Sequence, residues 1–133
     1  IVEATQRHGI TLLANPESGV PVLRSARVLV NPVFAGSGVN IKTVEMLFTP
    51  AQLVSTTQGL TGLPGEVTRH FHCADAPDAF AGAILQGLAV PEGNLAAERA
   101  EARRLFSFAG ATELMRSIQQ ETARFKVARK SPL

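Results

Sequence analysis

The stretch Pro32-Val-Phe-Ala-Gly-Ser-Gly-Val-Asn-Ile-Lys-Thr-Val-Glu45 decides how the rest of the chain is interpreted. It follows an apolar run over 26–30 that is typical of a buried strand, and it leads into a run over 41–48 that is typical of a helix. A glycine loop between a strand and a helix is a common phosphate site. Glycines let the backbone approach the ligand, and the helix start offers unpaired N–H groups. The stretch therefore predicts a site for a phosphorylated ligand.

Glu45 lies one turn into the predicted helix, at a spacing that places it on one face with Ile41, Val44 and Phe48. Three of these four side chains are apolar, so we expect this face to point toward the interior. A carboxylate in such a stripe needs a hydrogen-bond donor, because burying it unpaired costs free energy. A ribose diol would be a suitable donor.

Two plainer interpretations of the same residues stay open. Gly36 and Gly38 would also suit a tight strand-to-helix turn with no ligand, and Glu45 would also pair with Lys42 across one helical turn. The short Gly-x-Gly string does not match the longer glycine fingerprints of dinucleotide sites or P-loops.

Length, composition and charge narrow the class of protein. The chain has 133 residues and is 45% hydrophobic, which suits one domain with a real core. Its formal net charge of +2 is too small to indicate a nucleic-acid partner. A single cysteine, Cys73, excludes an internal disulfide and fits a reducing compartment.

Strand-like and helix-like segments alternate along the chain. Strands are expected over 10–13, 26–30, 53–56 and 68–73, and helices over 41–48, 94–106 and 109–125, with another starting at Asp75-Ala-Pro-Asp78, where Asp75 is the expected N-cap. This alternation predicts an α/β fold with a parallel sheet. We expect one domain with its core over 10–90, C-terminal helices over 94–125 and a basic tail over 126–133.

The last of these predicted helices has a clear apolar face, made of Ala111, Leu114, Met115, Ile118, Thr122 and Phe125. Basic residues gather beyond it, at 124, 126, 129 and 130, with no acid among them. Contact with anionic lipid is one interpretation of these charges, and a solvated tail is the other.

The string Gly36-Ser-Gly-Val-Asn-Ile-Lys-x-x-Glu45, followed by Gln52-Leu-Val-Ser-Thr-Thr-Gln-Gly59-Leu-Thr-Gly-Leu63, resembles retaining glycosyltransferases of the GT-B type, group 1. The resemblance implies a partial doubly wound, Rossmann-like parallel sheet with helices on both faces and a C-terminal helical extension. It also implies that the chain is a piece of the C-terminal, donor-binding domain. The first two strands of that domain, and the N-terminal acceptor domain as a partner, are then expected outside this sequence.

The same resemblance implies a set of donor-binding residues. Glu45 would bind the ribose hydroxyls, and Lys42 would neutralise phosphate. The remaining positions would contact the sugar and diphosphate or line the cleft, namely Gly36, Ser37, Gly38, Val39, Asn40, Thr57, Gln58 and Gly59. The common motif of the family has a further glutamate near position 37, where this chain has none, so the resemblance assigns no catalytic residue.

The activity implied is transfer of a hexose from a nucleotide-diphosphate sugar, with retention, by a cytoplasmic enzyme of polysaccharide biosynthesis at the inner face of the membrane. The nucleotide sugar is the co-substrate, and no metal or other cofactor is expected. The alternative is a non-catalytic module that binds a nucleotide or another protein. The string His70-Phe-His-Cys73 suggests a metal site, but ordinary strand histidines explain it without one.

Overall fold

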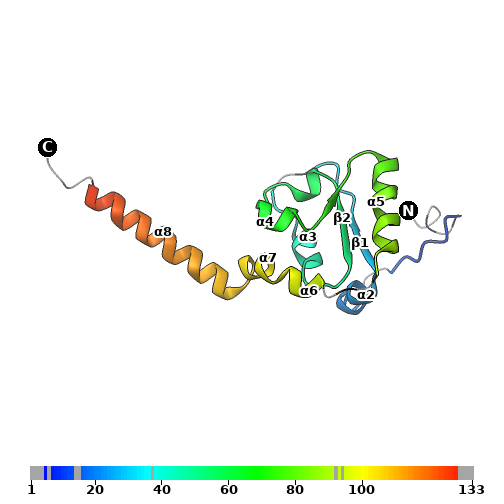
Figure 1. Cartoon of the computed structure of the whole chain (residues 1–133), viewed down its shortest axis with the longest axis horizontal. Helices are drawn as coiled ribbons and strands as arrows, with labels where there is room; N and C mark the ends of the chain where they lie inside the picture. The colour runs from blue at the N-terminus through cyan, green and yellow to red at the C-terminus, as the bar shows by residue number, and fades with distance from the viewer. Residues whose placement is uncertain are drawn as a thin grey trace.

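The computed structural model describes residues 5, 7–13, 16–36, 38–91, 93 and 95–128. In these ranges the chain forms an α/β domain around a small parallel sheet, and a long C-terminal helix projects away from it (Figure 1). The α/β class predicted from the alternation is thus confirmed. The elements in chain order are α2 (Val20–Ser25), β1 (Val28–Asn31), α3 (Ile41–Met46), β2 (Gln52–Ser55), η1 (Gln58–Leu60, a 3-10 helix), α4 (Gly65–Thr68), β3 (His72–Cys73), α5 (Pro77–Ala89), α6 (Leu95–Glu98), α7 (Ala100–Leu105) and α8 (Phe108–Ala128).

The sheet has three parallel strands in the order β1-β2-β3. In register, Asn31 at the end of β1 lies opposite Ser55 at the end of β2. Leu53 and Val54 of the central strand are both fully buried, although consecutive side chains point to opposite faces. Both faces of the sheet are therefore covered, as in other parallel sheets.

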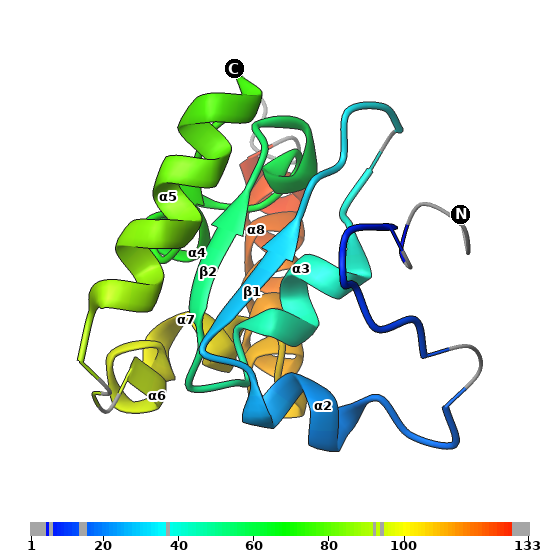
Figure 2. The same cartoon turned by 90° about the vertical axis from the view of Figure 1, so that its right-hand side faces the viewer.

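Helices α5 and α3 cover these two faces (Figure 2). Helix α5 approaches the sheet closely at Gly87, where an added Cβ would lie 3.1 Å from side-chain carbons of both Val28 and Gln52. On the other face, Met46 and Leu47 pack with Leu53 in the main hydrophobic cluster. Gly87 thus allows α5 to lie this close to the sheet.

The C-terminal helices join the same core. Ala102 of α7 is fully buried with Val67 of α4 and Phe71. Arg99, between α6 and α7, is only 3% exposed and donates from Nη1 to the carbonyl oxygen of Thr49 at 2.9 Å. Burial lowers the pKa of this guanidinium from its ordinary value. Arg99 therefore ties the C-terminal helices to the segment that follows α3, and Ala102 packs them against α4.

Two strand predictions are wrong. The segment 10–13 is exposed coil, because no neighbouring strand pairs with it and a turn ends just before it, at Gly9 with φ 67°. The strand expected over 68–73 is reduced to His72–Cys73, since Thr68 ends helix α4 and residues 69–71 form the turn that follows it. β1 is therefore an edge strand of the described sheet.

The start of α5 also differs from the prediction. Asp75 does not cap it, because Ala76 occupies the N-cap position and Pro77 begins the helix. The helix expected over 94–106 divides into α6 and α7 at Arg99. The helix expected over 109–125 is confirmed as α8. The tail expected over 126–133 is helical as far as 128 and then lies outside the described residues.

No helix in the described ranges combines the length and apolar character needed to cross a bilayer.

Candidate functional site

The glycine loop over 32–40 leaves the carboxyl end of β1, where ligands of open α/β sheets bind. Gly36 has φ 141° and Gly38 has φ 81°, which are conformations that residues with a side chain rarely adopt. An added Cβ at either position would meet nothing within 4 Å. The glycines are therefore needed for backbone conformation, and the loop faces open space. Ser37, between them, lies outside the described residues.

Asn40 is the N-cap of α3. Its Oδ1 accepts from the N–H of Lys42 at 3.0 Å, and its carbonyl accepts from the N–H of Thr43 at 3.1 Å. Two of the first donors of this six-residue helix are thus already satisfied within the chain. The loop before the helix, rather than the helix end itself, has the backbone free to meet a ligand.

A pocket of about 370 Å³ opens beside the glycine loop, and we call it the loop pocket. Gln58, in the turn after β2, forms its far wall and donates from Nε2 to the carbonyl of Gly36 at 2.9 Å. Six of the expected donor-binding residues come together in its lining, namely Gly36, Gly38, Val39, Asn40, Lys42 and Gln58.

The expectation that Glu45 leans into the interior is wrong, because its face of α3 is exposed. Ile41 is 73% exposed and Phe48 is 47% exposed. The buried face of this segment consists instead of Thr43, Met46 and Leu47. Both sets of positions have helical spacing with apolar members, and the hydrogen bonds of Thr43 explain which one turns inward.

Glu45 lines a second pocket of about 450 Å³, which we call the Glu45 pocket. Its other walls are mostly apolar and include Leu13, Leu23 and Val30. Lys42 lines both this pocket and the loop pocket. The two pockets therefore share Lys42, and the other lining residues include the loop glycines in one pocket and Glu45 in the other.

A buried polar network lies beneath the loop pocket. Asn31 donates from Nδ2 to Thr43 Oγ1 at 2.8 Å, and that hydroxyl donates to the carbonyl of Gly59 at 2.8 Å. Ser55 Oγ donates to the carbonyl of Asn31 at 3.2 Å. A Cβ at Gly59 would come within 2.3 Å of Ser55 Oγ. The ends of β1 and β2, helix α3 and the η1 turn are thus fixed to one another.

This network cannot be predicted from the sequence alone. The signal that points to it is the run of polar residues at the ends of two apolar strands, at Asn31 and at 55–57. Thr56 continues the network, because its hydroxyl donates to the carbonyl of Val33 and accepts from the N–H of Gly59 at 3.1 Å. The base of the glycine loop is therefore held by side-chain hydroxyls.

Asp75 holds the turn that presents Gln58. Its Oδ1 accepts from the N–H of Thr57 at 2.8 Å, and its Oδ2 accepts from the Thr57 hydroxyl at 2.7 Å. These two hydrogen bonds, the hydroxyl bond first, lower the pKa of the Asp75 carboxyl from its ordinary 3.8. Thr57 and Gly59 do not line the loop pocket and serve instead to position Gln58.

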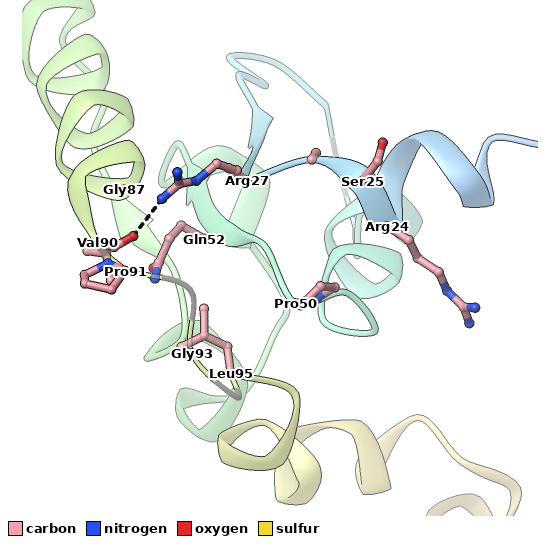
Figure 3. A pocket seen from close by; sticks show the side chains of 11 residues that line it. Arg24, Ser25, Arg27, Pro50, Gln52, Gly87, Val90, Pro91, Gly93 and Leu95 are labelled. Carbon is pink, nitrogen blue, oxygen red and sulfur yellow. Dashed lines mark hydrogen bonds between the residues drawn. The ribbon is translucent and has the colours of Figure 1, made fainter.

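A smaller pocket, of about 190 Å³, lies at the opposite end of the sheet (Figure 3). Arg27 donates from Nη2 to the carbonyls of Leu88 and Val90, at 3.1 and 3.0 Å, and so closes the end of α5. Arg24 points away from this pocket in Figure 3. Among the described lining residues, Arg27 is the cation directed into the pocket, and it is already bound to backbone. We therefore assign the pocket a structural role.

The histidine segment has an ordinary structural environment. His70 Nε2 is buried without a hydrogen-bond partner in the described structure, and burial, followed by the charges of Arg69 and Arg99, lowers the pKa of this side chain from 6.5. His72 and Cys73 are exposed. Among the described residues, no three His, Cys, Asp or Glu side chains come together as a metal site.

Comparison with protein-family models, with curated proteins and with solved structures found no match to this chain.

Proposed function

We propose that this chain is the donor-binding part of a retaining glycosyltransferase of the GT-B type, and that it binds a nucleotide-diphosphate sugar at the loop pocket and the Glu45 pocket. The observation that carries the proposal is that Lys42, near the carboxyl end of a parallel strand, lines both of these pockets. One pocket supplies glycine backbone for phosphate, and the other supplies a carboxylate beside apolar walls.

The ligand would extend across both pockets. The diphosphate would lie in the loop pocket against the backbone over 36–39, with the Lys42 ammonium as its counter-charge. The ribose hydroxyls would donate to the exposed Glu45 carboxylate, and the base would occupy the apolar part of the Glu45 pocket near Leu13 and Val30. The pocket volumes, about 370 and 450 Å³, lie within the range usual for such ligands.

Transfer would break the bond between the anomeric carbon and the phosphate oxygen and form a bond to an acceptor oxygen on the same face of the sugar, and the proton of the acceptor hydroxyl would pass to the leaving diphosphate. Negative charge then develops on the leaving diphosphate. Loop amides and Lys42 would stabilise this charge without reorganising, because hydrogen bonds from Thr56 to the Val33 carbonyl and from Gln58 to the Gly36 carbonyl already hold the loop. The acceptor would come from the partner domain that the resemblance implies.

The edge of the sheet supports the doubly wound arrangement. β1 has no strand on its outer side in the described structure, and exposed apolar side chains border it, including Val30, Phe34 and Ile41. A doubly wound domain of strand order 3-2-1-4-5-6 would place further strands against this edge. Natural proteins seldom leave such an edge uncovered.

One observation favours the non-catalytic alternative. The described lining of the loop pocket contains no Asp, Glu or His, so none of these side chains is available there as a general acid or base. A chain of this kind would bind the nucleotide without turnover. Activity of the full-length protein on nucleotide sugars that falls in both Glu45→Ala and Lys42→Ala but is kept in Glu66→Gln would favour the enzyme.

The binding proposal can be tested by NMR titration of the chain with UDP, GDP and ADP. We expect one of these to shift the backbone signals over 36–45 and of Gln58. Glu45→Gln should weaken its binding about tenfold, because a charged acceptor of two ribose hydroxyls is lost. Glu66→Gln, the same change on the exposed start of α4, should leave the affinity unchanged. Absence of shifts with all three nucleotides would overturn the proposal.

A further inference from the structure

Helix α8 projects from the domain (Figure 1), and several of its apolar side chains are exposed. Phe108 is 90% exposed, Leu114 62%, Met115 58% and Ile118 48%. Isolated exposed apolar residues are common on protein surfaces, but a continuous stripe along a projecting helix is a feature of interaction surfaces.

The spacing of this stripe identifies the kind of partner. Apolar side chains and one threonine alternate at steps of three and four residues, at Phe108, Ala111, Met115, Ile118, Thr122 and Phe125. These are the a and d positions of three consecutive heptads, with Phe108 at the first a, and Leu114 lies beside them at a g position. Such a strict 3.5-residue repeat makes a narrow seam, which suits another helix better than a lipid surface.

The rest of the chain holds α8 from the side opposite this seam. Gly110 packs against the end of α7, where an added Cβ would lie 2.1 Å from the carbonyl oxygen of Arg104. The Arg104 guanidinium also pairs with Glu113 and with Glu101. Gly110 and Glu113 occupy positions c and f, which face away from a and d. The seam therefore stays open when α8 is anchored to its own domain.

We propose that α8 pairs with α8 of a second copy of this chain in a parallel two-stranded coiled coil. The charges beside the seam support this orientation. Glu121 is a g position and Lys126 is the e position that follows it, and a parallel pair brings g of one helix beside e of the next heptad of its partner. An antiparallel pair brings g beside g and e beside e, which removes this attraction. The proposal does not depend on the proposed function.

The association can be tested by sedimentation velocity on the whole chain over about 5 to 500 µM, since the dimer fraction follows concentration. We expect the mass to rise from 14.1 kDa toward twice that value. Ile118→Lys should raise the dissociation constant about tenfold or more, because it places a charge in the seam. Gln120→Lys adds the same charge at an outward f position and should leave the constant unchanged.

The fold of these variants is not at risk, because Ile118 and Gln120 are both exposed on the projecting helix. Far-ultraviolet circular dichroism should confirm this. A wild-type chain that stays monomeric throughout, or that responds equally to both lysines, would overturn the proposal. So would a monomer that sediments with phosphatidylserine–phosphatidylcholine vesicles and loses that binding in Ile118→Lys, since α8 would then be a lipid-binding helix.

Orientation can be tested by cross-linking in a Cys73→Ser background, which removes the single native thiol. Thr122→Cys places a thiol at an a position, where it faces its own counterpart only in a parallel, in-register pair. We expect it to form a disulfide-linked dimer under mild oxidation, and Gln120→Cys at the outward position to form much less. A dimer by sedimentation in which Thr122→Cys fails to cross-link would overturn the parallel arrangement.

Discussion

Thr43 is the residue on which the loop pocket depends most directly. Its buried hydroxyl accepts from Asn31 and donates to the carbonyl of Gly59, so it links β1, α3 and η1 through a single oxygen. Threonine was not an expected member of a buried face, because its hydroxyl needs partners that only the tertiary structure supplies. The residue that orients α3 is thus a polar one.

We predict that Thr43→Val lowers the free energy of unfolding by about 1–3 kcal/mol, because valine fills the same space but leaves the Asn31 amide and the Gly59 carbonyl unsatisfied. Urea denaturation measures the change. The control is Thr61→Val, at an exposed threonine, which should stay within about 0.5 kcal/mol of wild type. Equal losses in the two variants would show that the buried hydroxyl has no special role.

Asp75 makes the stability of the chain depend on acid pH. Its pKa is lowered in the folded state by the hydrogen bonds from Thr57, so the unfolded chain binds the proton more readily. The stabilisation is fully present above the ordinary pKa of 3.8 and is lost as the pH falls through the lower folded pKa. We therefore predict that Asp75→Asn destabilises the chain at pH 6 and that its difference from wild type narrows below about pH 3.8.

Denaturant unfolding at a series of pH values measures this difference. Glu17→Gln, in the exposed segment before α2, removes a carboxylate without such hydrogen bonds and is the control. A gap between Asp75→Asn and wild type that stays constant down to pH 2 would contradict the assignment.

At the scale of elements, the closeness of α5 to the sheet rests on one glycine. Gly87 faces Val28 and Gln52 at a distance that leaves little space for a methyl group, whereas Gly82 of the same helix has nothing within 4 Å of an added Cβ. We predict that Gly82→Ala raises the free energy of unfolding by about 0.5–1 kcal/mol through helix propensity. Gly87→Ala should instead lower it by about 1 kcal/mol through overpacking.

Thermal and urea unfolding of the two variants measure the contrast. Because both substitutions add the same methyl group to the same helix, propensity contributes equally to each. If Gly87→Ala stabilised the chain as much as Gly82→Ala, the packing of α5 would not be limited by this glycine.

The elements differ in how far the sequence determines them. β1 and β2 could be predicted because each is a short apolar run bounded by polar or turn residues, and α8 because its apolar repeat is long. The segment 10–13 has the same apolar character but no strand to pair with. Strand formation there depends on a neighbour, which local sequence does not report.

The candidate site could be predicted only in part, because some of its features also depend on residues from other elements. The glycine loop could be located because Gly36 and Gly38 are needed for local backbone conformation. The orientation of Glu45 could not, since α3 offers two faces of similar apolar content and the choice between them rests on Asn31 and Gly59, from other elements. The role of Asp75 could not be predicted either, because its local sequence is typical of a helix start while its partner, Thr57, lies 18 residues earlier.

At the scale of the whole molecule, two exposed apolar surfaces lie on different parts of the fold. One is the outer edge of β1, with exposed apolar side chains that include Val30 and Phe34. The other is the seam of α8, which is regular and helical. Under the two proposals, the first would be covered within a larger donor-binding domain and the second by another copy of the chain. Loss of the α8 contact should therefore leave nucleotide binding intact.

The bond from Arg27 to the end of α5 has a consequence for synthesis of the chain. Arg27 binds carbonyls at Leu88 and Val90, 61 and 63 residues further on. Because the ribosome makes the chain from its amino end, these two hydrogen bonds cannot form until α5 has been made. Until then one face of β1 and β2 lies bare, and the nascent chain passes through a stage in which those two strands must be sheltered from other molecules.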